Sequence, residues 1–496
     1  MFCTDQQRAD SLGCYGNALA RTPNIDTVAA RGMCFDNHLS PNQICSPSRG
    51  TIVTGLYPRH HGMTTNGRTM HDGLATLPGL LSRAGYATHA VGKLHLQPIM
   101  ADASFGYPES VPFWEAGLGD RWRGPYFGYD TVDFVIGESL LATEGGHYAK
   151  WLRSHHPEVP PLYQPESALE LPPADLDEAW TSAVPDALHY NTWIADRAMA
   201  FIERAEPPFM LFVSTPDPHH PFSPPRPWSD RFDAADIPPP RVVAEELGRM
   251  PDYVQAHLGA DWIDNNAKRV EQGGMTVTDA ISPASLAKAV ALTRGMEAQI
   301  DHQFGRVLAK LDAMGMRDET VVVFTSDHGE FLGNHGLLHK GPPPYRDLCQ
   351  VSFVMAGPGI SRAERTSAPT SHLDLAPTLL ALAGVDAQGL GDDGESLLPV
   401  LRGERLERRE RFLEFHPRID ARVYNHSIVT DEWRLTLYPN GDRDWGELFD
   451  LERDPGEHEN LFNHPAHRAV RDRLGERLVS RFPADPEAGT ELIAKW

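Results

Sequence analysis

Apolar residues in the first 385 positions fall into two alternating patterns. Short apolar runs predict buried strands, and one of them, 321–325, is rich in β-branched residues, as buried parallel strands are. Longer stretches with apolar residues at helical spacing predict helices. The predicted strands are 86–91, 209–213 and 321–325, and the predicted helices are 22–32, 77–84, about 286–314 and 373–383. This alternation of strands and helices predicts a doubly wound α/β domain.

Two stretches break the alternation, residues 98–190 and 223–281. Both are rich in proline, aromatic and polar residues, and both show little periodicity. They are therefore predicted to be long insertions. Insertions of this size on a rigid scaffold often shape binding pockets.

The pattern changes near residue 385. Short apolar runs separated by turn residues, such as Asn440 and Gly441, predict a small antiparallel sheet. Its predicted strands are 412–415, 421–429, 433–438 and 447–451, and a helix is predicted from about 467 to 482. We therefore predict a main α/β domain at 1–385 and, at 386–496, a C-terminal subdomain with an antiparallel sheet and a terminal helix.

The composition is typical of a soluble globular protein, with 496 residues of which 41% are hydrophobic and 23% charged. The formal net charge of −23 argues against a nucleic acid as partner. No apolar run approaches the ~18 residues that a membrane-spanning helix needs, so no membrane partner is expected. The sequence leaves the oligomeric state open.

The five cysteines are too few, and odd in number, for a disulfide framework. Free thiols favour a reducing compartment, so we expect a cytoplasmic protein. No signal peptide is recognisable. Only residues 1–4 precede Asp5, which leaves little room for a first strand. A longer natural N-terminus, and with it a periplasmic or secreted location, stays open.

Polar side chains follow the three predicted strands and the short strand stub at residues 1–4. They are Asp5 and Gln6, Lys93 and His95, His219, and Asp327 and His328. In an open α/β sheet the carboxyl ends of parallel strands share one edge, where ligands bind. Each group alone fits a solvated turn or an ordered loop. Four of them in one α/β domain favour a common site.

The hexapeptide 45–50, CSPSRG, adds a nucleophile. Pro47 suits the first turn of a helix because it lacks an N–H group that would be unpaired there. Cys45 is then predicted just before the helix start, where free N–H groups favour anions. Arg49 lies one helical turn further and returns to the same face. The alternative is a buried structural cysteine.

These residues suit chemistry on an anionic ester. Asp5, Asp327, the Gln6 side-chain oxygen and His328 offer ligands for a divalent cation, with oxygen donors favouring Ca²⁺, Mg²⁺ or Mn²⁺. Such a cation would polarise a sulfuryl or phosphoryl oxygen. Positive charge around the remaining oxygens and two imidazoles for proton transfer complete the set. The expected cations are Lys93, Lys340 and Arg49, and the imidazoles are His95 and His219.

Together these motifs resemble the sulfatase family over nearly the whole chain. The matching segments are 4–7, 22–26, 45–55, 85–88, 92–95, 218–221, 325–330, 374–378 and 447–451, with Asp454 and Pro455. Their number and order are very specific to the family. The resemblance implies an alkaline phosphatase-like fold, in which a mixed, mostly parallel sheet is flanked by helices and a smaller C-terminal antiparallel sheet follows.

The resemblance also implies roles for the site residues. Cys45 resembles the precursor of formylglycine, made by a formylglycine-generating enzyme. Asp5, Gln6, Asp327 and His328 resemble metal ligands, with position 45 contributing as well. The other implied roles are Arg49 steadying the formylglycine, Lys93 and Lys340 binding sulfate, Lys340 or His219 near the leaving oxygen, and His95 as the base that releases sulfate.

We therefore expect an arylsulfatase-like sulfuric ester hydrolase that acts on a small sulfated substrate with one divalent metal. Ca²⁺ is expected first, with Mn²⁺ and Mg²⁺ as alternatives. Many sulfatases have Asp where this chain has Gln6 and Asn where it has His328, and the Gln and His pair resembles phosphonate monoester hydrolases. A phosphonate monoester or phosphodiester hydrolase with the same nucleophile is the second hypothesis. A catalytically silent anion-binding fold is the third.

Overall fold

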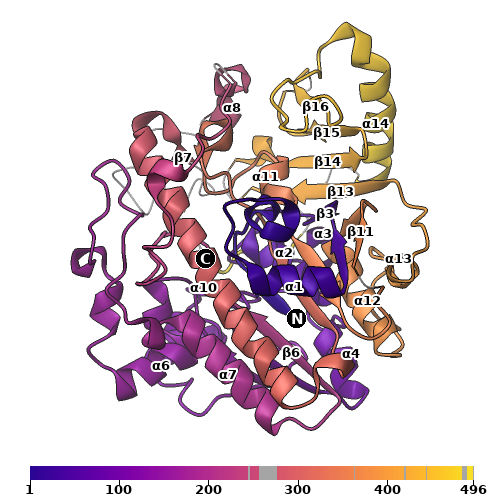
Figure 1. Cartoon of the computed structure of the whole chain (residues 1–496). Coiled ribbons are helices and arrows are strands. Elements are labelled where there is room, and N and C mark those ends of the chain that lie inside the picture. Colours follow the sequence, from indigo (N-terminus) through magenta and orange to yellow (C-terminus); the bar gives the residue numbers. More distant parts are fainter. Residues whose placement is uncertain are drawn as a thin grey trace.

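A computed structural model describes residues 1–243, 246–255, 276–361, 363–417, 420–442, 444–482 and 489–494 (Figure 1). Its centre is an eight-stranded sheet of mixed direction. In spatial order the strands are β11 (Glu364–Thr366), β2 (Met33–Phe35), β10 (Phe353–Ala356), β8 (Val322–Ser326), β1 (Phe2–Thr4), β6 (Phe209–Ser214), β4 (Ala87–Gly92) and β5 (Thr131–Phe134). The predicted strands at 86–91, 209–213 and 321–325 are β4, β6 and β8.

The middle of this sheet is parallel. β1 pairs in parallel with β6 and with β8, so that Phe2 lies opposite both Val213 and Phe324. β4 pairs in parallel with β6 and β5. β10 runs antiparallel to β8 and β2, which makes the sheet mixed and mostly parallel, as predicted. The carboxyl ends of β1, β4, β6 and β8 therefore lie at one edge.

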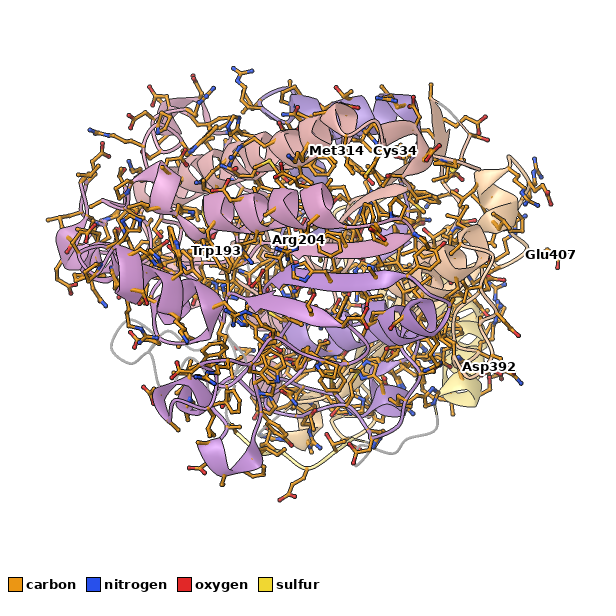
Figure 2. All side chains as sticks on the ribbon, turned by 90° about the horizontal axis from the view of Figure 1, so that it is seen from below. Cys34, Trp193, Arg204, Met314, Asp392 and Glu407 are labelled. Atoms are coloured by element: carbon orange, nitrogen blue, oxygen red, sulfur yellow. The ribbon has the colours of Figure 1, made fainter. Side chains whose placement is uncertain are left out.

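Helices cover both faces of the sheet, and side chains fill the space between the layers (Figure 2). On one face, apolar residues of three helices join the core around Phe2 and Phe324. These helices are α1 (Pro23–Arg31), α7 (Tyr190–Arg204) and α10 (Pro283–Ala313). On the other face lie α2 (Cys45–Thr54), α4 (Leu77–Arg83) and α12 (Leu375–Leu382). The predicted helices thus correspond to α1, α4, α10 and α12.

The stretch 98–190 is more ordered than its sequence predicts. It contains α5 (Val111–Glu115), the edge strand β5 and α6 (Gly146–His155). β5 is only four residues long, too short for its alternation to stand out in the sequence. The described part of 223–281 holds short elements, α8 (Asp252–Gln255) and β7 (Thr276–Val277), and the rest of that predicted insertion lies outside the described residues.

A second sheet of four antiparallel strands confirms the predicted C-terminal fold. It comprises β13 (Glu410–Phe415), β14 (Asn425–Thr430), β15 (Trp433–Leu437) and β16 (Gly446–Asp450), and α14 (Arg468–Arg481) packs on it. The strand predicted at 421–429 begins late, because 421–423 forms a helical turn. The domain boundary near residue 385 stays a prediction.

Among the described residues, no helix combines the length and apolarity needed to cross a membrane. All five cysteines are free thiols, and four of them are buried.

Candidate active site

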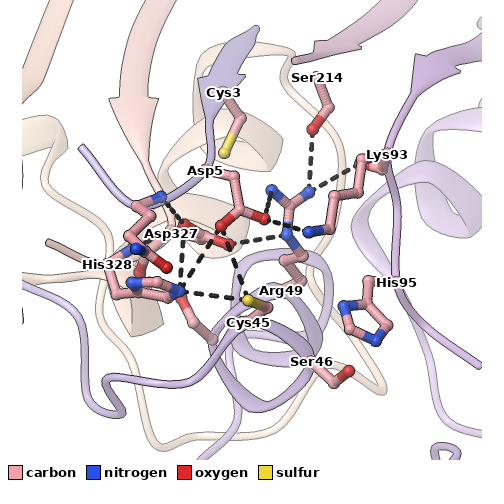
Figure 3. Close-up of polar contacts among 12 residues, drawn as sticks. Cys3, Asp5, Cys45, Ser46, Arg49, Lys93, His95, Ser214, Asp327 and His328 are labelled. Carbon is pink, nitrogen blue, oxygen red and sulfur yellow. Dashed lines mark hydrogen bonds and ion pairs between the residues drawn. The ribbon is translucent and has the colours of Figure 1, made fainter. Parts of the chain in front are cut away.

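The parallel strands and one helix bring the predicted polar residues to a single place (Figure 3). Asp5 follows β1, Lys93 follows β4 and Asp327 follows β8, while α2 points its first residue, Cys45, at the same spot. Gly92, at the end of β4, permits the close approach of β4 and β6. A Cβ atom on Gly92 would lie 1.8 Å from the carbonyl oxygen of Ser214, and Gly92 also has a φ of +102°.

Cys45 lies at the centre of the site and is the first residue of α2, not the residue before it as predicted. Its Sγ atom is 3.0 Å from Lys340 Nζ, 3.2 Å from His328 Nε2 and 3.6 Å from Asp5 Oδ1. Burial, together with the Asp5 carboxylate, raises the pKa of the Cys45 thiol to about 12. The unmodified side chain is therefore a neutral thiol and a poor nucleophile at neutral pH.

Arg49 connects four strand ends beneath the nucleophile. Its Nε atom lies 2.8 Å from Asp327 Oδ2, and one terminal nitrogen lies 3.1 Å from Asp5 Oδ2. The other terminal nitrogen donates to the carbonyl oxygen of Lys93 at 2.7 Å and to Ser214 Oγ at 2.9 Å. The fork of guanidinium donors fixes both carboxylates, a pairing that the helical spacing after Cys45 did not predict.

Four side chains offer converging ligand atoms. One atom each from Asp5, Cys45, Asp327 and His328 lies within 4.8 Å of the others. The Nδ1 atom of His328 is 2.9 Å from the carbonyl oxygen of Gly329, to which it donates, so the Nε2 lone pair faces Cys45. Burial lowers the pKa of His328 to about 4, so the ring is neutral, the form that binds metals.

Gln6 and Lys340 complete this group. Gln6 has a left-handed backbone, with φ at +64°, and its Oε1 atom accepts a hydrogen bond from Lys340 Nζ at 2.7 Å. The same ammonium lies 3.0 Å from Cys45 Sγ and 3.2 Å from His328 Nε2. The Lys340 ammonium thus lies among the candidate metal-ligand atoms. The donor set of carboxylate and amide oxygens with one imidazole suits a divalent metal.

Lys93 contacts the other carboxylate oxygen of Asp5, not the one nearest Cys45. Its Nζ atom is 2.8 Å from Asp5 Oδ2 and 2.8 Å from Glu138 Oε2. Burial opposes the charge of Lys93, but these two carboxylates raise its pKa. Burial likewise opposes ionisation of Asp5, but Lys93 and Arg49 hold its pKa well below its usual value. Both groups are therefore charged.

The two predicted proton-transfer residues differ in their contacts. His219 Nδ1 donates to the carbonyl oxygen of His220 at 2.6 Å and lies 3.8 Å from Glu138 Oε1. His95 is 2% exposed, has a φ of +53° and finds no hydrogen-bond partner for either ring nitrogen among the described residues. Burial, with Lys93 and Arg49 nearby, lowers the pKa of His95 to about 3, so its ring is neutral.

The loop that carries Lys93 and His95 is held by a buried acid. The carboxylate of Glu109 accepts hydrogen bonds from the backbone N–H groups of Leu94, His95 and Leu96 and from the Tyr126 hydroxyl. These bonds hold His95 in a left-handed backbone conformation. A residue with a Cβ atom adopts this conformation only where the surrounding structure compensates for the strain. No motif in the sequence marks Glu109, which lies more than a dozen residues further along the chain.

Four further residues contact the predicted set and were not assigned from sequence: Glu138, Ser214, His220 and Glu330. Glu138 pairs with Lys93, and Ser214 accepts from Arg49. Gln6 Nε2 donates to Glu330 and lies 3.1 Å from His220 Nδ1. His220 and Glu330 lie in the motif segments 218–221 and 325–330, so the sequence could have identified them as site residues. Glu138 lies in a stretch without any motif.

Comparisons with known proteins cover nearly the whole chain. The family model described as Sulfatase matches residues 1–385, and the model described as N-sulphoglucosamine sulphohydrolase, C-terminal, matches residues 333–482. The chain is 28% identical over 511 residues to an arylsulfatase of Clostridium perfringens (strain 13 / Type A), a match that covers 99% of this chain and 95% of that protein.

Solved structures show the same fold. The phosphonate monoester hydrolase of Agrobacterium radiobacter has a TM-score of 0.79 and 26% identity, with 97% of this chain and 94% of that chain covered. The structure of BT4656 in complex with its substrate D-glucosamine-2-N,6-O-disulfate has a TM-score of 0.70 and 22% identity, with 97% and 96% covered. This second likeness concerns the fold alone.

Proposed function

Because the chain belongs to the sulfatase family, we propose that it hydrolyses a sulfate monoester of a small molecule, with the nucleophile made from Cys45. The observation that carries this proposal is the convergence of Asp5, His328 and Lys340 on Cys45 Sγ. This arrangement places a nucleophile between metal-ligand atoms and a fixed positive charge, as attack on an anionic ester requires.

Two groups would complete the site. Formylglycine at position 45, formed by a formylglycine-generating enzyme, would supply a hydrate with one hydroxyl for attack and one for release of sulfate. A divalent metal would add Lewis-acid polarisation of a sulfuryl oxygen. We propose Ca²⁺, with Mn²⁺ and Mg²⁺ as alternatives. Its ligands would be Asp5, Gln6, position 45, Asp327 and His328.

The cations of the chain would bind the ester. Arg49 fixes both carboxylates, Lys93 presents its ammonium beside Asp5, and Lys340 presents a third positive charge at Cys45. Lys340 lies on the side of Gln6 and His328, where it can offset charge on a leaving oxygen. His219 is the alternative partner for that oxygen.

His95 would take the proton that must leave before sulfate is released. Its ring is neutral, so the ring nitrogen that carries no hydrogen can accept a proton, and neither nitrogen has a partner among the described residues. The loop held by Glu109 keeps the ring in place.

A second candidate is hydrolysis of phosphonate monoesters or phosphodiesters with the same nucleophile. Two observations favour it. Gln6 and His328 bring no formal charge to the ligand set, and the similarity to a phosphonate monoester hydrolase is extensive. These esters carry one negative charge, as a sulfate monoester does. A phosphate monoester carries a further charge, which would strengthen binding of the ground state without a matching stabilisation of the transition state.

The test is a hydrolysis panel of sulfate, phosphonate, phosphodiester and phosphate monoester substrates with a common nitrophenol leaving group. Mass spectrometry of the peptide that contains Cys45 first establishes the modified fraction. We expect kcat/KM to be highest for the sulfate ester and lowest for the phosphate monoester. Diesters hydrolysed faster than every sulfate ester would move the chain to the second candidate. Unmodified Cys45 with no bound metal and no turnover would indicate the silent anion-binding fold.

A further inference from the structure

A second cluster of metal-ligand side chains lies outside the site described above. Glu246, His335 and His458 each offer a ligand atom, and these atoms lie within 4.8 Å of one another. Glu246 Oε1 is 2.5 Å from His335 Nδ1, and Glu246 Oε2 is 3.3 Å from His458 Nδ1. One carboxylate thus faces the same nitrogen, Nδ1, of two imidazoles whose ring centroids are 4.8 Å apart.

We propose that this cluster binds a divalent transition metal of the Zn²⁺ class. Two imidazole nitrogens and one carboxylate oxygen form a three-ligand set that Zn²⁺ binds in tetrahedral geometry, with water in the fourth position. Imidazole donors favour transition metals over Ca²⁺ and Mg²⁺. The cluster shares no residue with the candidate active site, whose donors include two carboxylates, an amide oxygen and position 45.

The surroundings of His335 match those of a metal ligand. Its other ring nitrogen, Nε2, lies 3.7 Å from Asp347 Oδ2. Asp347 is itself held, because Arg8 lies 2.9 Å from its Oδ1 atom and Asn334 Nδ2 donates to its Oδ2 atom at 3.0 Å. At this distance Asp347 acts by electrostatic attraction, which favours a hydrogen on Nε2 and leaves Nδ1 as the nitrogen for a metal.

The backbone also fixes this imidazole. His335 has a φ of +58°, a left-handed conformation that costs energy for a residue with a Cβ atom, and it lies in a tight turn between Gly333 and Gly336. Its side chain is 2% exposed, and the Tyr345 ring packs at a centroid distance of 4.3 Å. The turn and the ring contact therefore hold the His335 imidazole next to Glu246.

The third ligand leaves room for water. The His458 side chain is 20% exposed, and both histidines line a cavity of about 860 Å³. A water molecule from this cavity can complete the coordination. A metal here would join three parts of the chain, since Glu246 precedes α8, His335 follows β8 and His458 follows β16. It would therefore stabilise the folded chain by an amount that grows with the logarithm of the ratio of free metal concentration to Kd.

The test uses the full chain, stripped with a chelator and then kept in excess Ca²⁺ to supply the candidate active site. Bound Zn²⁺ is counted by elemental analysis, and Tm is measured against Zn²⁺ concentration. We expect one Zn²⁺ per chain that excess Ca²⁺ does not displace, with a rise in Tm. In His458→Gln we expect Zn²⁺ affinity to fall at least about tenfold and the rise in Tm to disappear. The partly exposed position of His458 makes this variant expected to fold.

Two variants serve as controls. His155→Gln changes an exposed histidine on α6 and should keep both the stoichiometry and the rise in Tm. Cys45→Ala should also keep its Zn²⁺, because position 45 is not a ligand of this cluster. Absence of Zn²⁺ binding in the original chain would overturn the proposal. Equal Zn²⁺ affinity in His458→Gln, or loss of Zn²⁺ in Cys45→Ala, would overturn it as well.

Discussion

Two networks of buried charge among the described residues differ in their balance of cations and carboxylates. The first surrounds Cys45, and its inner members are three cations and two carboxylates. These are Arg49, Lys93, Lys340, Asp5 and Asp327. Next to it, His95 keeps both ring nitrogens without a partner among the described residues.

The second network lies in the C-terminal sheet around Arg434 of β15. The Nε atom of Arg434 is 2.5 Å from Glu457 Oε1, and another of its nitrogens is 3.5 Å from Glu447 Oε2. The guanidinium also lies over the rings of Tyr345 and Phe449, at 5.0 and 4.7 Å from their centroids. Here one cation faces two carboxylates and two aromatic faces.

The difference shows which buried charges can serve chemistry. Around Cys45 the three cations are balanced by Asp5, Asp327 and Glu138, so a bound divalent metal would make this site positive and stabilise an added anion. Around Arg434 the carboxylates exceed the cation, and an added anion would be repelled. We therefore expect substitutions in the first network to change activity more than stability, and those in the second to do the reverse.

The strongest test of this contrast is Cys45→Ala, which we expect to abolish turnover. Cys45→Ser offers one hydroxyl in place of two, so it should give at most a single turnover, with the sulfated serine visible by mass spectrometry. Both variants should keep a Tm near that of the original chain, because the side chains are similar in size. Cys349→Ala changes another buried free thiol and is the matched control that should stay active. Multiple turnovers by either Cys45 variant would refute the nucleophile assignment.

The next effect in size concerns the metal ligands. Asp327→Asn keeps the shape of the side chain but removes one of two charges from the proposed ligand set, so metal affinity should fall more than about 100-fold. Activity should fall with it and recover partly at high metal concentration. Glu447→Gln removes a buried carboxylate from the other network and should leave metal content unchanged. Equal metal affinity in both variants would contradict the ligand assignment.

The converse test is Arg434→Met. It leaves Glu447 and Glu457 buried without their cation, and breaking a buried pair in this way costs about 3–5 kcal/mol of unfolding free energy. Because these carboxylates are not part of the candidate active site, kcat/KM of the folded fraction should stay within about twofold. Chemical denaturation and initial rates on the same preparation measure both quantities. A large loss of kcat/KM at temperatures where the variant is folded would show that the two networks are coupled.

Much of the first network could be predicted because topology alone brings it together. Asp5, Lys93 and Asp327 follow parallel strands, and the carboxyl ends of such strands must share one edge. Arg49 could be placed from helical spacing after Cys45. Glu138 could not be placed, because its contact with Lys93 depends on how a stretch without periodicity folds back over the sheet.

The fold shows the same division. Long periodic segments, such as α10, were predicted to within a few residues, because many apolar positions support each other. The edge strand β5 was missed, since four residues carry too little pattern. In the second network, Arg434 and Glu457 are 23 residues apart. Their pairing depends on the path of the chain after β16, which has no periodic pattern in the sequence.

A smaller effect is expected from Lys340→Met. Lys340 Nζ lies 3.0 Å from Cys45 Sγ, where it can offset charge on the leaving oxygen. Its loss should lower kcat/KM about 10-fold for a nitrophenyl sulfate and about 100-fold for an alkyl sulfate, whose leaving oxygen needs more help. Lys150→Met, at an exposed pair with Asp120, is the control. An equal loss for all leaving groups would assign Lys340 to binding of the sulfate group instead.

The smallest effect is a pH dependence of stability beneath the candidate active site. Burial, supported by Glu138 and Asp5, raises the pKa of Asp217 to about 7, although Tyr190 and Asn191 donate hydrogen bonds to it. Between pH about 4 and 7 the unfolded chain has released this proton and the folded chain still binds it. The contribution of Asp217 to stability is thus present at low pH and is lost as the pH rises through about 7.

Asp217→Asn should remove this slope. The unfolding free energy of the original chain minus that of the variant should therefore decrease by more than about 1.4 kcal/mol from pH 4 to 7, the equivalent of one pKa unit. Glu414→Gln is a control of opposite sign. Burial acts against ionisation of Glu414, but His416 and Arg59 lower its pKa to about 2, so its contribution is present above pH about 4.5 and lost as the pH falls. A flat difference curve for Asp217→Asn would mean that this acid is ionised in the folded chain, and that the site tolerates another negative charge next to Asp5.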